Sequence, residues 1–134
     1  MNLIECVPNF SEGRNQDKIR QIVDAIASDS KIALLGCDPG AGANRTVVTF
    51  AGSPDAVLAA AFRGIERAAD IIDMRQHRGV HERIGATDVC PLVPLGEGRV
   101  EDCIPLARAL GARVGRDLGI PVYLYGAAAT RAQR

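Results

Sequence analysis

Both histidines of the chain lie in one short polar segment, residues 77–83, with the sequence HRGVHER. An imidazole titrates near neutral pH, which is what a group that takes up and releases protons requires. Two arginines of this segment, Arg78 and Arg83, could hold a carboxylate through paired N–H donors, and Asp88 could orient an imidazole. We therefore expect the chemistry to be centred here, with His81 as the acid/base group. Solvated loop charges are the alternative interpretation.

Two other chemistries are weaker interpretations of the same histidines. His77 and His81 could bind a metal if their segment were helical, but Gly79 disfavours a helix and no third ligand is obvious. Ser11 and His81 could form a nucleophilic pair, yet nothing in their spacing supports it, because such a nucleophile needs a sharp turn or an adjacent base. We expect no metal site.

Two further polar segments, residues 9–14 and 38–45, each follow a predicted strand. Helix capping and a glycine-rich hairpin turn are their structural interpretations. The second segment resembles a phosphate-binding loop only superficially, because it lacks the Lys-Ser/Thr pair and precedes a strand. Ligands of open α/β sheets tend to bind at strand ends. The three polar segments are therefore expected to form one site, with Asn9 in its wall and Asn44 and Arg45 offering hydrogen-bond donors.

The elements that must position these segments alternate along the chain. Asn15 and Ser53-Pro54 are helix starts, and Gly119 is a helix end. The order of the first six elements matches the split βαβ pattern of ferredoxin-like folds. We therefore expect an α/β (α+β) domain with a mixed sheet and helices on one face, the other face staying open unless something covers it. Periodicity and turn signals predict strands at 2–7, 31–37, 45–51, 88–93 and 121–125, and helices at 15–28, 53–73 and 101–118.

Composition narrows the class of protein. The chain has 134 residues, with 16 basic and 16 acidic side chains. A single domain is expected, and the absence of a basic excess argues against a nucleic-acid partner. No run is apolar enough to span a membrane, and the first residues show no signal-peptide pattern, so the cytoplasm is the expected compartment. Cysteines at positions 6, 37, 90 and 103 form no CxxC pair and are expected to be buried free thiols.

Taken together, the polar segments resemble the formiminotransferase family. The matching motifs are ECVPNFSEGRN at 5–15, NRTVVTFAG at 44–52, IIDMRQHRGVHERIGATDVCPLVP at 71–94 and PVYLYG at 121–126. The resemblance implies transfer of the formimino group of N-formimidoylglutamate to the co-substrate tetrahydrofolate, a late step of histidine degradation that is fused to a cyclodeaminase in some organisms. It also implies two α/β subdomains whose sheets face each other around a folate tunnel, usually within a dimer.

The same resemblance implies roles for individual residues. The acid/base histidine of the family falls on His81, with His77 as a supporting residue. Asp38 and Arg45 match positions that line the folate site. Carboxylates of glutamate-type substrates and of the folate tail suit arginines such as Arg78.

Residues 1–134 are expected to be the N-terminal subdomain alone, as a truncated chain or a natural half-length protein. Half of the folate tunnel would then be absent. The alternative is a non-catalytic half-domain that binds a small molecule or dimerises through its open sheet face.

Overall fold

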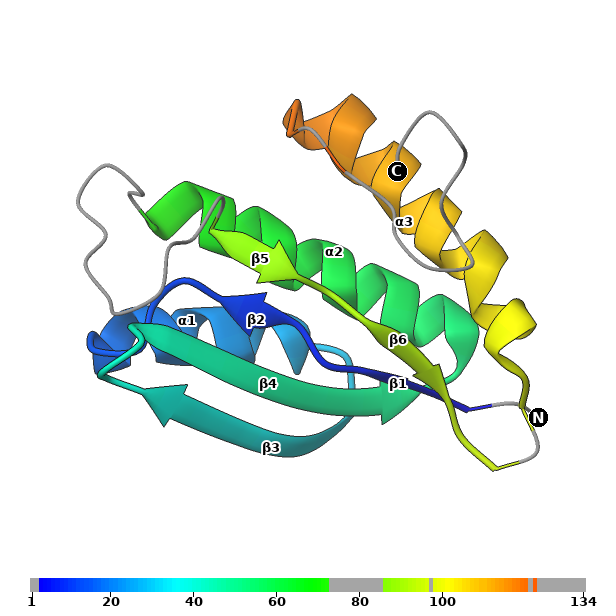
Figure 1. Ribbon diagram of the computed structural model, residues 1–134, viewed down its shortest axis with the longest axis horizontal. Coiled ribbons are helices and arrows are strands. Elements are labelled where there is room, and N and C mark those ends of the chain that lie inside the picture. The colour runs from blue at the N-terminus through cyan, green and yellow to red at the C-terminus, as the bar shows by residue number, and fades with distance from the viewer. Residues whose placement is uncertain (1–2, 73–85, 97, 121, 123–134) are drawn as a thin grey trace.

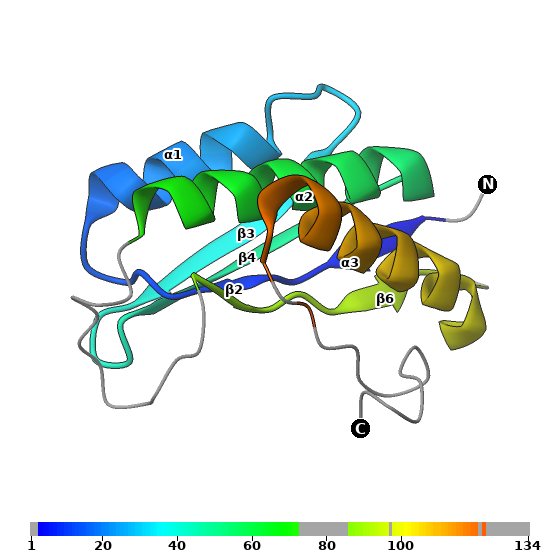
Figure 2. The ribbon, with the colours of Figure 1, turned by 90° about the horizontal axis from the view of Figure 1, so that it is seen from above.

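The computed structural model describes residues 3–72, 86–96, 98–120 and 122. Three α-helices lie on one side of a curled sheet: α1 (Gln16–Ile26) and α2 (Pro54–Ile71) cover its face, while α3 (Ile104–Leu118) packs along α2 (Figures 1 and 2). The strands are β1 (Ile4–Cys6), β2 (Asn9–Phe10), β3 (Ala33–Gly40), β4 (Arg45–Gly52), β5 (Thr87–Val89) and β6 (Leu92–Pro94), and the 3-10 helix η2 (Val100–Cys103) leads into α3. The α+β class with helices on one face is confirmed.

The sheet has the ferredoxin-like arrangement. β1 and β2 follow each other along β4, and β6 and β5 pair with them on the other side, while β3 pairs with the outer edge of β4. The expectation of a mixed sheet is wrong for the described strands, because every pairing among them is antiparallel. A split βαβ unit requires this result, since its two parallel strands are separated by a third strand of opposite direction.

Three strand boundaries differ from those expected. Pro8 interrupts the first strand, but pairing resumes at β2, where a loop was expected. The strand predicted at 88–93 is divided into β5 and β6. β3 continues through Pro39, where the sequence predicted a turn, and Pro39 pairs with Thr46. An edge strand tolerates proline because one side of its backbone needs no partner. The strand predicted at 121–125 lies outside the described residues, except Val122.

Local chemistry fixes the helix ends. The side chain of Asn15 accepts a hydrogen bond of 3.1 Å from the backbone N–H of Lys18, and Ser53 caps α2 through Ala56 at 3.4 Å. Gly119 ends α3 with a φ of 67°, a left-handed conformation that glycine adopts at little cost. The three predicted caps are therefore confirmed.

The core lies between the sheet and the helices. Phe10, Phe50 and Val48 point from the strands toward Ile22 and Ile26 of α1 and toward the inner face of α2, all of them buried. Each such side chain contributes about 1.5–3 kcal/mol when it is removed from water. All helices in the described part of the chain therefore lie on one face of the sheet, and we call the opposite face the helix-free face (Figure 2).

Candidate functional site

Two of the predicted site residues lie in one row across the helix-free face of the sheet. Val47 of β4 is paired with Asn9 of β2 on one side and with Asp38 of β3 on the other. Directly paired residues share a face, and neighbouring strands are about 4.8 Å apart, so Asn9 and Asp38 are separated by about 10 Å across Val47. Arg45 lies two residues before Val47 and therefore on the same face of β4. The buried residues Thr46 and Val48 lie on the other face.

The row combines polar and apolar groups. The Asn9 amide donates a hydrogen bond of 3.2 Å to the carbonyl oxygen of Val7. Partial burial, and secondly the Asp38 carboxylate, raises the pKa of the neighbouring Cys37 thiol. Cys37 is exposed, which corrects the expectation that all cysteines are buried; it lies on an edge strand that no helix covers. A ligand on this face would therefore meet acceptors at Asp38, a cation at Arg45 and a flat apolar centre.

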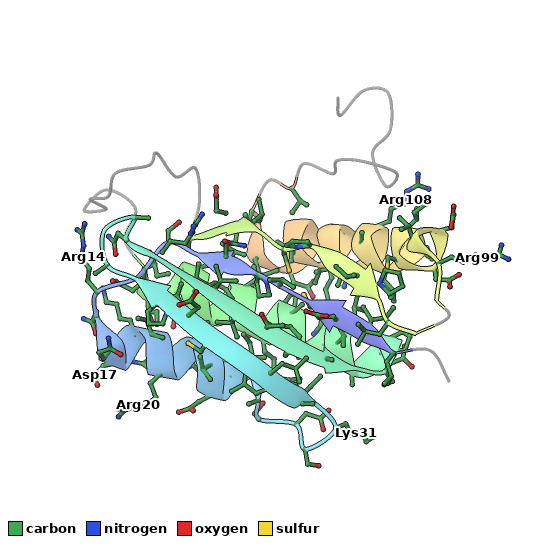
Figure 3. The ribbon with its side chains drawn as sticks, turned by 60° about the horizontal axis from the view of Figure 1, so that its bottom comes forward. Arg14, Asp17, Arg20, Lys31, Arg99 and Arg108 are labelled. Atoms are coloured by element: carbon green, nitrogen blue, oxygen red, sulfur yellow. The ribbon has the colours of Figure 1, made fainter. Side chains whose placement is uncertain are left out.

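The segment after β2 is fastened to the turn between β3 and β4. The backbone N–H of Gly13 donates a 2.8 Å hydrogen bond to Oδ1 of Asn44, and the Arg14 guanidinium donates one of 2.8 Å to the carbonyl of Ala41. The hydroxyl of Thr46 donates to the carbonyl oxygen of Glu12. Figure 3 shows Arg14 at the end of the molecule where this turn lies. Two of the three predicted site segments are thus brought together.

Gly13 makes this approach possible. A β-carbon placed on Gly13 would lie 2.4 Å from the carbonyl oxygen of Gly40 and 2.5 Å from the backbone nitrogen of Arg45. Only a residue without a side chain fits between these backbone atoms. The glycine in the first polar segment therefore allows direct contact between backbones at the edge of the candidate site.

Asn44 has a structural role that its sequence context did not reveal. It is the one non-glycine residue with positive φ in the described part of the chain, at 52°, and only 7% of it is exposed. Its side-chain oxygen is engaged by Gly13. Asparagine suits this position because its short polar side chain tolerates the left-handed conformation. Whether Asn44 also contacts a ligand stays a prediction.

Thr46 is the site residue that sequence reasoning missed. It was expected only as part of the strand predicted at 45–51, yet it is buried, with 1% exposed, and its hydroxyl supports the backbone of Glu12. The carboxylate of Glu12 in turn accepts hydrogen bonds of 3.1 and 3.0 Å from the backbone N–H groups of Arg14 and Asn15. A threonine near the start of a β-branched strand sequence gave no signal of this contact.

The third predicted segment, including His77, Arg78, His81 and Arg83, lies outside the described residues. The described residues that bracket it are Ile72, the residue that caps the C-terminus of α2, and Ala86, whose carbonyl oxygen accepts a 2.8 Å hydrogen bond from the backbone N–H of Ser11. The end of α2 and the start of β5 both lie at the end of the molecule that carries β2 and the β3–β4 turn (Figure 1).

The described residues do not meet the requirements of a metal site or of a membrane-spanning helix. Among these residues, no group of three or more His, Cys, Asp or Glu side chains is placed to hold a metal ion. No helix within the same ranges has the length and hydropathy needed to cross a membrane.

A family model and individual relatives of known name point to the same family of proteins. Residues 3–134 match the family model described as formiminotransferase domain, N-terminal subdomain. The chain is 53% identical over 134 residues to a glutamate formimidoyltransferase of Thermoplasma acidophilum, covering 100% of this chain and 44% of that protein. It is 46% identical over 132 residues to the formimidoyltransferase-cyclodeaminase of Rattus norvegicus, covering 98% of this chain and 24% of that protein. The chain thus spans less than half the length of either relative.

Proposed function

The chain belongs to the formiminotransferase family, as its N-terminal subdomain, and from this premise we propose that it supplies one wall of an active site for formimino transfer. The donor would be N-formimidoylglutamate and the acceptor tetrahydrofolate, as in histidine degradation in the cytoplasm. The names of the relatives support the donor, since these proteins are glutamate formimidoyltransferases and formimidoyltransferase-cyclodeaminases. The observation that carries the proposal is the row of Asn9, Val47 and Asp38 on the helix-free sheet face.

The proposed reaction needs two proton transfers. A ring nitrogen of the folate forms a bond to the amidine carbon, and a proton leaves that nitrogen. The bond between this carbon and the glutamate nitrogen then breaks, and the electron pair and a proton go to the departing amine. We assign both transfers to His81, first as base and then as acid. General acid–base catalysis of this kind is worth roughly 100- to 10,000-fold.

The described residues support a binding role for the sheet face. The Asp38 carboxylate can accept hydrogen bonds from N–H groups of a flat heterocycle, and Val47 offers that heterocycle an apolar surface. Arg45 can pair with a substrate carboxylate, a geometry that guanidinium groups match well. We also assign Asn9, Asn44 and the segment with His77 and Arg78 to this site. The row provides one wall only, which agrees with a fold that needs a partner layer.

The partner layer would be the second formiminotransferase subdomain. On the helix-free face or its rim, Val89, Val93 and Leu3 are 38%, 41% and 46% exposed. Exposed apolar side chains on one sheet face favour a surface that is covered in the working protein. We propose that the working protein is a homodimer of such two-subdomain chains.

The same exposed surface supports a second candidate function. The chain could be a non-catalytic half-domain that pairs with a copy of itself through the helix-free face. Sedimentation velocity of the isolated chain distinguishes the two functions, because self-pairing predicts a dimer that a Val93→Lys substitution dissociates. A monomer at all concentrations would contradict this candidate.

Formimino transfer by this chain together with a second subdomain tests the main proposal. His81→Ala should reduce turnover by roughly 100-fold or more, as expected for loss of an acid/base group. Arg20→Ala, at an exposed position of α1, is the matched control and should leave turnover unchanged. Near-normal turnover of His81→Ala would contradict the assignment, and absence of transfer by the unchanged protein would contradict the proposed function itself.

A further inference from the structure

We propose that Cys6 and Cys90 form a reversible disulfide when the protein meets a hydroperoxide, so that the pair is a site of oxidative modification. The sulfur atoms of these residues lie 3.5 Å apart although 84 positions separate them in the sequence. Both are free thiols in the structure. Closing the remaining gap requires a shift of about 1.5 Å, since the sulfur atoms of a disulfide are about 2.05 Å apart.

Strand register fixes this proximity. Cys6 of β1 is paired with Leu92 of β6, and Cys90 lies two positions before Leu92 on the same strand path. The backbone N–H of Val7 donates a 3.0 Å hydrogen bond to the carbonyl of Pro91, which continues the pairing between the two segments. Residues two positions apart on a strand point to the same face, so the two thiols meet diagonally on the core side.

The two thiols differ in accessibility. Cys6 is fully buried, with 0% exposed, while Cys90 is half-buried and packs at the margin of the core. A hydrogen bond with Cys90 and burial together raise the pKa of the Cys6 thiol well above its usual range. An oxidant reaches the more accessible sulfur first. Cys90 is therefore the thiol that is attacked, and Cys6 is the resolving thiol.

The chemistry balances in two steps. The Cys90 sulfur attacks one oxygen of hydrogen peroxide, the O–O bond breaks, and Cys90 becomes a sulfenic acid while one water is released. The Cys6 sulfur then attacks the sulfur of the sulfenic acid, the S–O bond breaks, and the thiol proton of Cys6 leaves with the hydroxyl group as a second water. Two sulfur atoms are oxidised by one electron each, and the peroxide accepts both electrons. A dithiol reductant reverses the bond by exchange.

The bond would join a central strand to the junction of β5 and β6. Cross-linking residues far apart in sequence restricts the unfolded chain, and the effect grows with the length of the closed loop. The oxidised protein should therefore unfold at a higher temperature than the reduced protein. This outcome does not depend on the proposed transferase function.

Peptide mapping of the peroxide-treated protein tests the proposal. The protein is treated with hydrogen peroxide, free thiols are blocked with N-ethylmaleimide, and the protein is digested without reductant for mass spectrometry. A linked pair of peptides containing Cys6 and Cys90, lighter by two hydrogen atoms and released by dithiothreitol, is the expected result. Cys90 found as sulfinic acid with Cys6 alkylated would overturn the proposal.

Two variants sharpen this test. The double substitution Cys37→Ser/Cys103→Ser removes the other thiols and should keep the cross-link. Cys90→Ser should leave Cys6 reduced at the same peroxide dose, with no rise in the unfolding temperature. Loss of the cross-link in the double variant would also overturn the proposal, because the bond would then require Cys37 or Cys103.

Discussion

Oδ1 of Asn44 accepts a 2.8 Å hydrogen bond from the backbone N–H of Gly13, across 31 positions of sequence. The contact fastens the segment after β2 to the turn between β3 and β4. Asn44 makes it from a left-handed backbone conformation with a φ of 52°. The hydrogen bond of the side chain and the left-handed backbone therefore make separate contributions to the free energy of unfolding, and these can be measured separately.

Replacing Asn44 should separate them. Asn44→Gly keeps the backbone conformation but leaves the Gly13 N–H without its acceptor, which costs about 1–3 kcal/mol. Asn44→Ala loses the same hydrogen bond and adds about 1–2 kcal/mol, because a β-carbon disfavours positive φ. Urea unfolding should rank the proteins wild type, Asn44→Gly, Asn44→Ala in falling stability. Equal stability of the two variants would show that the backbone conformation relaxes.

Gly13 should tolerate no side chain. A β-carbon there meets three backbone atoms of Gly40 and Arg45 at 2.4–2.8 Å. Gly13→Ala should therefore cost about 3 kcal/mol or more, at the upper end of overpacking effects. Gly42→Ala is the matched control, since a β-carbon there meets nothing within 4 Å. Thermal unfolding of both variants checks this, and a Gly13→Ala protein as stable as Gly42→Ala would refute the close approach.

The local features of this fold were predictable from sequence. Asn15, Ser53 and Gly119 mark helix ends through contacts made within a few residues, so the sequence nearby contains the information. The short β2 strand and the division of β5 from β6 depend on pairing between distant segments. Cys37 is exposed because its strand, β3, lies at the edge of the sheet. Thr46 is buried because the segment after β2 packs on it. Both features depend on contacts between segments that are distant in sequence.

The candidate site was predicted in part. The contacts of Gly13, Arg14 and Thr46 bring residues 9–14 and 38–45 together, while their joint role in a site stays a prediction. The expectation rested on the tendency of strand ends to converge at one edge of a sheet. Residue types alone could not reveal that Asn44 uses its side-chain oxygen within the chain. The role of His81 rests on the family resemblance and stays a prediction.

Asp38 should contribute to folate binding but not to folding. If its carboxylate accepts hydrogen bonds from tetrahydrofolate, Asp38→Asn should raise the dissociation constant roughly 10- to 150-fold, the equivalent of about 1.5–3 kcal/mol. Asp24→Asn makes the same change on the exposed side of α1, on the other side of the sheet, and should leave binding unchanged. Calorimetry on the chain with a second subdomain measures both. Equal affinities would remove Asp38 from the site.

Two glycines in helices should respond oppositely to alanine. In α2, a β-carbon on Gly64 meets side-chain atoms of Ile26 at 2.8 and 3.0 Å, so Gly64→Ala should destabilise the packing of α1 on α2 by about 1–3 kcal/mol. In α3, the nearest atom to a β-carbon on Gly115 is 3.9 Å away. Gly115→Ala should stabilise by about 0.5–1 kcal/mol, the helix preference for alanine. Chemical unfolding at one temperature gives both values, and shifts of the same sign would contradict the packing argument.

Cys6 should make stability fall as the solution becomes alkaline. The hydrogen bond with Cys90 and burial raise the pKa of Cys6 in the folded protein, whereas an unfolded thiol titrates near about 8.5. Above that pH the folded chain binds more protons than the unfolded chain, so the stabilisation is complete at neutral pH and decreases as pH rises. One such group lowers the free energy of unfolding by at most about 1.4 kcal/mol per pH unit. Cys37 and Cys103 have pKa values raised in the same direction and add to this trend.

Urea unfolding between about pH 8 and about pH 9.5, below the main titration of lysine and tyrosine, measures the slope of this decrease. Cys6→Ala should give a shallower slope than the unchanged protein, whatever its absolute stability, because the variant lacks the thiol that titrates. Cys37→Ala is the control, since Cys37 lies on the exposed edge strand and its pKa is raised less far. Its slope should lie between those of the unchanged protein and Cys6→Ala, because Cys37 adds only a smaller share of the decrease. A Cys6→Ala slope equal to that of the unchanged protein would mean that the thiol titrates alike in the folded and unfolded chains.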